Sequence, residues 1–123
     1  MLPYPALHAS HGGIWVATPE GEVRGIGRGE AIRLAADTPM LVLNAPLVAQ
    51  RLGYAELSGL DLLELFAFLR PARFMVPTPK GLAAVTGLPA PESDADVAPF
   101  LRDAAVALLA LTDGDWPERG VLW

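Results

Sequence analysis

Cysteine is missing from the chain, and its 123 residues include only two histidines. Without cysteine the chain has neither a disulfide framework nor a thiolate metal site. Basic residues are also few: nine lysines and arginines stand against fourteen acidic residues, which gives a formal net charge of −5. Such a chain repels a polyanion on average, so its charge gives no reason to expect non-specific nucleic-acid binding. We expect a cytoplasmic protein, and the absence of cysteine is compatible with that location.

Long apolar runs are missing as well. No segment reaches the roughly 18–20 uninterrupted apolar residues that cross a bilayer, and the first residues lack the basic and apolar regions of a signal peptide. We therefore expect no membrane partner. Yet 52% of the residues are hydrophobic and the mean hydropathy is +0.35. This composition favours one domain with a real core, built as a sheet covered on both sides or as a surface that a partner covers.

The clearest strand lies at residues 39–44, where four apolar residues stand in a row between a proline and Asn44. A run that is apolar on both alternating faces is typical of a strand covered on both sides. Asn44 can cap a following helix, and Pro46 suits a first turn, where no N–H donor is needed. We therefore predict the central strand of an α/β sheet, with a helix leaving its carboxyl end, where sites usually lie.

The rest of the chain predicts a β-hairpin followed by helices. Residues 13–18 and 22–28 are rich in strand formers around a turn, and residues 6–10 can add a short strand. Apolar spacing, capping residues and terminating glycines or prolines predict helices at residues 29–37, 46–52, 62–69, 79–85 and 97–112. Gly53 is the predicted C-terminal cap of the second of these helices, and Thr78 is the predicted N-cap of the fourth. The helix at 62–69 is apolar on nearly all sides, which predicts deep burial. We place a domain at residues 1–112 and interpret residues 113–123 as a linker or tail toward a further part.

Most acidic residues fall at predicted helix caps, turns or the tail. Asp61 opens a capping box with Glu64 three residues on. Asp96 can cap the last helix, with Pro99 in its first turn. Asp103 lies within this apolar helix, where it either faces solvent or points inward near the end of the sheet.

Motifs for common chemistries are not visible. There is no phosphate-binding Gly-x-x-x-x-Gly-Lys-Ser/Thr, and no serine stands in a Gly-x-Ser-x-Gly elbow. His8 and His11 would share a face if they lay on a helix, and could then bind a metal. The two glycines that follow them are more typical of a turn or a strand end, and no third ligand is apparent.

Two phrases, at residues 43–48 and 59–68, resemble a known family: Leu-Asn-Ala-Pro-Leu-Val and Gly-Leu-Asp-Leu-Leu-Glu-Leu-Phe-Ala-Phe. With residues 79–89 and the last helix, this series resembles the DnaQ-like (DEDD, RNase H-like) 3′–5′ exonuclease domain. It is most similar to the degenerate N-terminal region of alphaproteobacterial DinG-type ATP-dependent DNA helicases. The resemblance covers roughly residues 6–112. It implies an α/β fold with an RNase H-like mixed sheet flanked by helices and an N-terminal β-hairpin.

The family holds two divalent ions with four carboxylates, which activate water and stabilise the leaving oxygen. Where its motifs carry most of these acids and a histidine, this chain has other residues: His8, Ser10, Val48 and Ala98. Asn44 matches the second motif, and only Asp103 matches a carboxylate, the last one. One carboxylate cannot hold two hard cations. The resemblance therefore implies no catalytic residue and no metal site here, with Asn44 and Asp103 as vestigial motif positions.

The resemblance implies a non-catalytic module of a DNA helicase, with a structural, docking or DNA-positioning role. Its partner would be the remainder of the helicase chain, and ATP and magnesium would act only there, so no cofactor is expected in this domain. Arg70, Arg73 and Lys80, on the only locally basic segment, are weak candidates for DNA contact, and solvated loop charges are the plainer interpretation of all three. Two alternatives stay open: an active divalent-metal 3′–5′ exonuclease with relocated ligands, and a free-standing protein-interaction module.

Overall fold

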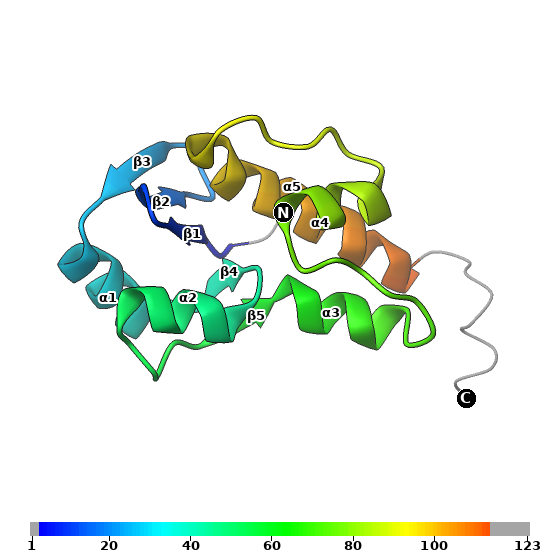
Figure 1. The fold of residues 1–123 in the computed structure, drawn as a ribbon, viewed down its shortest axis with the longest axis horizontal. Coiled ribbons are helices and arrows are strands. Elements are labelled where there is room, and N and C mark those ends of the chain that lie inside the picture. Colours follow the sequence, from blue (N-terminus) through cyan, green and yellow to red (C-terminus); the bar gives the residue numbers. More distant parts are fainter. Residues whose placement is uncertain (1–2, 114–123) are drawn as a thin grey trace.

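The computed structural model describes residues 3–113, and side chains as far as residue 110. These residues form a five-stranded sheet and five helices (Figure 1). The elements follow one another as β1 (Ala6–Ser10), β2 (Gly13–Ala17), β3 (Val23–Ile26), α1 (Arg28–Asp37), β4 (Met40–Val42), α2 (Ala45–Leu52), β5 (Gly59–Asp61), α3 (Leu62–Leu69), α4 (Pro79–Thr86) and α5 (Asp94–Asp113).

The sheet is mixed, with the strand order β3-β2-β1-β4-β5. β1, β2 and β3 form an antiparallel meander, which contains the predicted hairpin between β2 and β3. β4 and β5 each run parallel to the strand before them in this order, so β1, β4 and β5 point the same way. Parallel neighbours need a crossover, and α1 and α2 supply the helices that lead into β4 and β5. The predicted α/β class is therefore confirmed.

β4 is buried on both faces, as predicted, but it is not the middle strand. Met40, Leu41 and Val42 each expose 2% or less of their surface. β1 holds the middle of the sheet, and β4 lies beside it, between β1 and β5. Coverage on both faces marks every internal strand, so the apolar run could not distinguish the middle strand from its neighbour.

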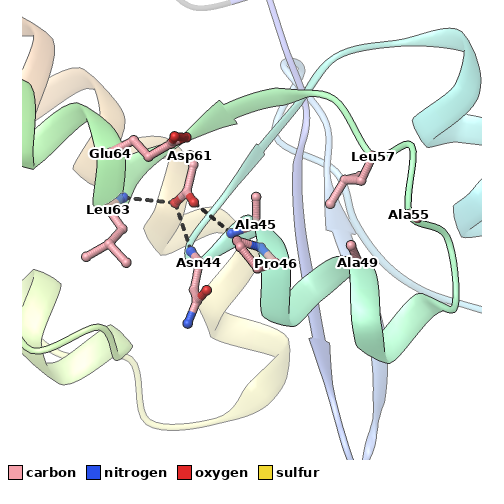
Figure 2. A pocket seen from close by; sticks show the side chains of 9 residues that line it. All are labelled: Asn44, Ala45, Pro46, Ala49, Ala55, Leu57, Asp61, Leu63 and Glu64. Carbon is pink, nitrogen blue, oxygen red and sulfur yellow. Dashed lines mark hydrogen bonds between the residues drawn. The ribbon is translucent and has the colours of Figure 1, made fainter.

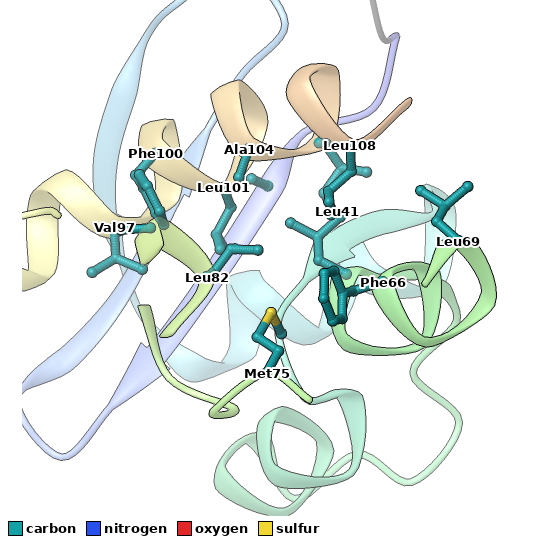
Figure 3. Packing of buried hydrophobic residues seen from close by; sticks show 14 residues of the cluster. Leu41, Phe66, Leu69, Met75, Leu82, Val97, Phe100, Leu101, Ala104 and Leu108 are labelled. Atoms are coloured by element: carbon teal, nitrogen blue, oxygen red, sulfur yellow. The ribbon is translucent and has the colours of Figure 1, made fainter. Parts of the chain in front are cut away.

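Two apolar clusters fill the two sides of the sheet. Leu7, Met40 and Val42 point to the side covered by α1 and α2. Ala6 and Leu41, their neighbours along the same strands, point to the side covered by α3, α4 and α5 (Figure 3). Successive side chains of a strand leave opposite faces, so each strand contributes to both clusters. The sheet is therefore the middle layer of three.

Two predicted helix caps are confirmed. The Asp61 carboxylate accepts the N–H of Leu63 at 3.0 Å and begins α3, and the Thr78 hydroxyl accepts the N–H of Gly81 at 3.1 Å and begins α4. Each side chain satisfies one of the N–H groups that a first turn leaves without a partner. The structure also places Gly53 at the C-terminal cap of α2, as predicted.

The start of α5 differs from the prediction. The helix begins at Asp94, and Asp96 lies inside its first turn. Ser93 precedes it: its C=O accepts the N–H of Asp96 at 3.1 Å, and its Oγ donates to Asp96 Oδ2 at 2.9 Å. Pro99 consequently lies beyond the first turn. Three acids and a serine within five residues offer several possible caps, and sequence alone does not choose among them.

The prediction that α3 is deeply buried is wrong for one of its faces. Leu62, Phe66 and Leu69 are buried, but Phe68 exposes 72% of its surface. α3 covers the sheet with one stripe only, because neighbouring elements do not surround it. An apolar sequence around a whole helix indicates covered surface, but it does not say that the cover belongs to the same domain.

The predicted tail falls mainly at residues 114–123, including Trp116 and Trp123, which lie outside the described residues. Within residues 3–113, none of the helices combines the length and the apolarity that crossing a bilayer requires.

Candidate functional site

The carboxyl ends of the three parallel strands β1, β4 and β5 meet at one edge of the sheet. Sites in α/β sheets usually lie at such an edge. Ser10 ends β1, Asn44 follows β4, and Asp61 ends β5. α5 adds Asp94, its first residue, because the carboxylate of Asp94 contacts His8 and Ser10. We therefore take this edge as the candidate functional site.

Asp61 is the only buried charged side chain among the described residues, with 5% of its surface exposed. Its Oδ1 accepts the N–H of Asn44 at 2.8 Å and that of Leu63 at 3.0 Å, and its Oδ2 accepts the N–H of Ala45 at 2.7 Å (Figure 2). Hydrogen bonds to an ionised acceptor are strong, and they offset the cost of burying the charge. One carboxylate thus caps both α2 and α3 and ties the end of β5 to the end of β4.

The predicted capping role of the Asn44 side chain is wrong. This side chain makes no capping hydrogen bond, and its amide points away from Asp61 in Figure 2. The backbone of Asn44 is left-handed, with φ 66° and ψ 72°, and no other non-glycine residue among those described has a positive φ. Asparagine tolerates this region better than most side chains. Asn44 therefore contributes the reversal from β4 into α2, and Asp61 supplies the cap.

His8, Ser10 and Asp94 form a second polar cluster at the same edge. Ser10 Oγ donates to Asp94 Oδ2 at 2.8 Å and accepts the N–H of Gly12 at 3.1 Å. His8 Nε2 lies 3.4 Å from Asp94 Oδ1, and its ring stacks on Trp15 with the ring centroids 6.2 Å apart. Both side-chain contacts go to the carboxylate. In a nucleophilic triad the histidine stands between the serine and the acid, so this order does not make one.

Burial lowers the pKa of His8, because a desolvated imidazole resists taking up a proton. Asp94 opposes this effect through its hydrogen bond and its charge, whereas the guanidinium of Arg51 adds to it. The pKa of Asp94 is itself lowered, chiefly by the hydrogen bond from Ser10. Arg51 also donates to the C=O of Ala9 at 2.7 Å. At neutral pH the edge therefore holds a neutral imidazole beside an ionised carboxylate.

Asn44 and Asp103, the two positions expected from the resemblance to be vestigial, lie in different surroundings. Asn44 lines a pocket of about 540 Å³ together with Asp61 and Glu64. Asp103 is exposed on α5 and lines a separate pocket with Asp96. Of the two orientations considered for Asp103, the solvent-facing one is therefore confirmed, and the acid of α5 that reaches β1 is Asp94.

The other predicted positions have plain structural surroundings. Val48 and Ala98 are buried in the core, on opposite sides of the sheet. His8 lies in β1 and the exposed His11 in the turn that follows, so these histidines belong to a strand and its turn, as predicted. Within residues 3–110, no three His, Cys, Asp or Glu side chains are placed so that they could hold a metal ion.

The three basic candidates do not form one group. Arg70 ends α3, and its N–H donates to the C=O of Phe66 at 2.8 Å. Arg73 follows in the α3–α4 loop, where its N–H donates to the C=O of Arg70 at 3.0 Å. Lys80 lies in the first turn of α4 and lines a groove with Glu92 and Asp94. The structure thus joins Arg70 with Arg73 and places Lys80 among acids.

Sequence reasoning missed the two roles that organise this edge. Asp94 lies 84 residues from Ser10, and nothing local to either residue indicates their contact. Asp61 carried a signal, its capping box, but that signal assigned it to α3 alone. Its second role, at α2, depends on the parallel pairing of β4 with β5.

Comparison with protein-family models, with curated proteins and with solved structures finds no match to this chain. A functional proposal therefore depends on the fold and on the side chains at this edge of the sheet.

Proposed function

We propose that this chain is a non-catalytic, exonuclease-like module of a DinG-type ATP-dependent DNA helicase, with a docking or DNA-positioning role. Its fold would then be the RNase H-like one that the sequence phrases imply. The mixed sheet with an antiparallel N-terminal meander, flanked by helices on both faces, supports this assignment. The phrases themselves fall at the junctions that build the site, β4–α2 and β5–α3.

The observation that carries the proposal is the composition of the carboxyl edge. A two-metal nuclease needs several carboxylate oxygens converging on open space. Here the Asp61 oxygens accept three backbone N–H groups, and the Asp94 oxygens face Ser10 and His8. Val48 is a buried hydrophobic residue. The acids at this edge thus hold the fold together, and the remaining role is that of a scaffold.

One specific observation supports the active-nuclease alternative. Asp94 and His8 lie together at the end of β1, near where the family's first motif would fall. A carboxylate and an imidazole are both divalent-metal ligands, so a single relocated ion is the form this alternative would take. The interaction-module alternative is favoured by the exposure of Phe68 and Phe74, at 72% and 82%.

A nuclease assay tests the proposal. The purified chain would be incubated with single-stranded and duplex DNA in magnesium and in manganese, beside Asp94→Asn and Asp103→Asn. We expect no cleavage above buffer in any arm. Cleavage that Asp94→Asn removes and Asp103→Asn leaves would establish the relocated-ligand nuclease and reject the scaffold. Cleavage that Asp103→Asn removes would show that Asp103, at the position of the family's last carboxylate, is catalytic.

The helicase context has its own test, the reading frame beyond the codon for Trp123. A frame that continues into Walker A and Asp-Glu-Ala-His motifs supports the module. A stop codon directly after that codon would leave the free-standing interaction module in its place.

A further inference from the structure

The two most exposed large apolar side chains of the described residues, Phe68 and Phe74, lie at the end of α3 and in the α3–α4 loop. Phe68, near the end of α3, exposes 72% of its surface, Phe74 exposes 82%, and Val76 exposes 49%. Figure 1 shows this loop leaving the end of α3 and returning between α3 and α4. Leaving two phenyl rings this exposed to water costs more free energy than leaving single apolar residues scattered over the surface. The exposure of the two rings therefore calls for an explanation.

The loop is held in place, so the exposure of Phe74 is not that of a loose segment. The hydrogen bond from Arg73 N–H to Arg70 C=O closes a turn between the two phenylalanines. Met75 is 4% exposed and points into the cluster alongside Phe66 and Leu82 (Figure 3). With Met75 turned inward, its neighbours in the chain are presented outward.

Gly81 fixes the other end of the loop against α4. A Cβ at Gly81 would collide with the carbonyl oxygen of Val76, and it would lie 2.8 Å from the Val76 Cβ. The N–H of Thr78 donates to the same carbonyl at 2.8 Å. The loop therefore displays its aromatic side chains from a fixed backbone.

The charge around this turn is opposite to that of the chain. Residues 65–91 contain no acid and three bases, whereas the whole chain has a net charge of −5. Two of those bases, Arg70 and Arg73, lie at the turn between the phenylalanines, and Lys80 lies among acids in another groove. At physiological salt, charges more than about 8 Å away are largely screened, so a ligand at the turn experiences chiefly the charges close to it, which include those of Arg70 and Arg73.

We propose that the surface formed by Phe68, Arg70, Arg73 and Phe74 binds single-stranded DNA, with bases stacking on the two rings and phosphates contacting the arginines. Stacking needs an unpaired base with a free face, so a duplex is excluded, and aromatic rings beside cations are the usual platform for single strands. The inference deepens the proposed function, on which the choice of DNA rests, by giving that function a surface.

A second copy of the chain fits this surface less well. A two-fold interface places the same patch on both partners, so the arginines of one copy would meet those of the other. A single strand has the opposite charge and offers apolar faces at regular intervals. It therefore matches both features of the surface, which a second copy does not.

The test is fluorescence anisotropy of a labelled oligothymidylate of about 15 nucleotides, long enough to cover one small binding site. We expect roughly tenfold weaker binding for Phe68→Ala and for Phe74→Ala, and recovery for Phe74→Trp. Arg73→Gln should weaken binding and reduce the slope of log Kd against log salt by about 0.7, the value for one phosphate contact on a single strand. Lys80→Gln is the matched control and should leave Kd unchanged.

The double variant with leucine at positions 68 and 74 separates nucleic acid from protein. Leucine keeps apolar area but has no π face, so the double variant should no longer bind the oligonucleotide. Because all these side chains are exposed, thermal melts should be unchanged, and a lower Tm would disqualify a variant. No binding by the unaltered chain, or equal binding of a blunt duplex, would overturn the inference while leaving the nuclease and reading-frame tests untouched. Concentration-dependent dimerisation that Phe68→Ala and Phe74→Ala lose and the double leucine variant retains would instead assign the surface to a second copy.

Discussion

The carboxylate of Asp61 caps the helix that follows Asn44, a residue 17 positions earlier in the chain, as well as the helix that it begins itself. This arrangement ties together the carboxyl ends of β4 and β5, which are parallel neighbours in the sheet. The carboxylate is buried and its three hydrogen bonds are partly buried, so without it the three N–H groups would lose charged acceptors that water replaces only in part. The site edge is therefore also a point on which stability depends.

We predict that Asp61→Asn lowers the free energy of unfolding by about 2–4 kcal/mol. The amide keeps one acceptor oxygen and turns its NH₂ toward backbone N–H groups, so at least one of them is left unsatisfied. Urea denaturation monitored by circular dichroism measures the change. Glu64→Gln, three residues on and exposed, is the matched control and should change stability by less than about 0.5 kcal/mol. Equal effects of the two variants would refute the double cap.

Gly59→Ala should disrupt the pairing of β4 with β5. Gly59 has a φ of +146°, and a Cβ there would collide with the carbonyl oxygen of Met40 and lie 2.6 Å from its nitrogen. Backbone cannot move aside as a flexible side chain can, so we expect a loss of more than about 3 kcal/mol in a thermal melt. Gly29→Ala, in a helix with only an arginine tip nearby, should raise stability by about 0.5–1 kcal/mol. A neutral Gly59→Ala would contradict the close approach of the two strands.

Gly81→Ala should reverse the usual effect of adding alanine to a helix. An interior glycine normally costs about 1 kcal/mol relative to alanine. At Gly81 the added methyl group meets Val76, and the loop must shift, so we expect a lower Tm. Hydrogen exchange of the Thr78 amide, which donates to the Val76 carbonyl, should rise at the same time. A stabilised variant with unchanged exchange would show that α4 does not press on the loop.

Acid should destabilise the fold through His8 before it does so through Asp94. The pKa of His8 is lowered from 6.5, so the folded state binds fewer protons than the unfolded state just below that value. Stability is therefore fully present above 6.5 and falls as the pH drops below it. The lowered pKa of Asp94 acts in the same direction, but only below 3.8.

The measurement is Tm between about pH 7 and pH 5, which spans the histidine range and lies above that of Asp94. The Tm of the His8→Gln variant should fall less steeply over this pH interval than the Tm of the unaltered chain. His11→Gln, in the exposed turn directly after Ser10, is the matched control. Parallel curves for all three proteins would show that burial of His8 does not contribute.

Local patterns predicted the local structure well. The helix at residues 62–69 has the predicted bounds, and the Asp61 and Thr78 caps are confirmed. These features depend on neighbours within four residues, where capping chemistry and side-chain period act directly. The predicted α/β class followed from the same patterns, summed along the chain.

Features that depend on distant pairing could not be predicted in this way. The contact of Asp94 with Ser10 and the second cap at Asn44 exist only after the strands are ordered. The exposure of Phe68 could not be predicted either, because α3 is apolar on nearly all sides and its sequence does not indicate which face stays exposed to solvent. Burial is a property of the assembled layers, whereas periodicity describes one element at a time.

The three residues of β4 connect the two layers of the protein. Met40 and Val42 belong to the cluster under α1 and α2, and Leu41 belongs to the cluster under α3, α4 and α5. Neither layer can separate from the sheet without exposing part of this strand. The amide of Leu41, which donates to the Pro5 carbonyl at 2.8 Å, should consequently exchange with deuterium only when the whole domain opens. The domain should thus unfold as one cooperative unit.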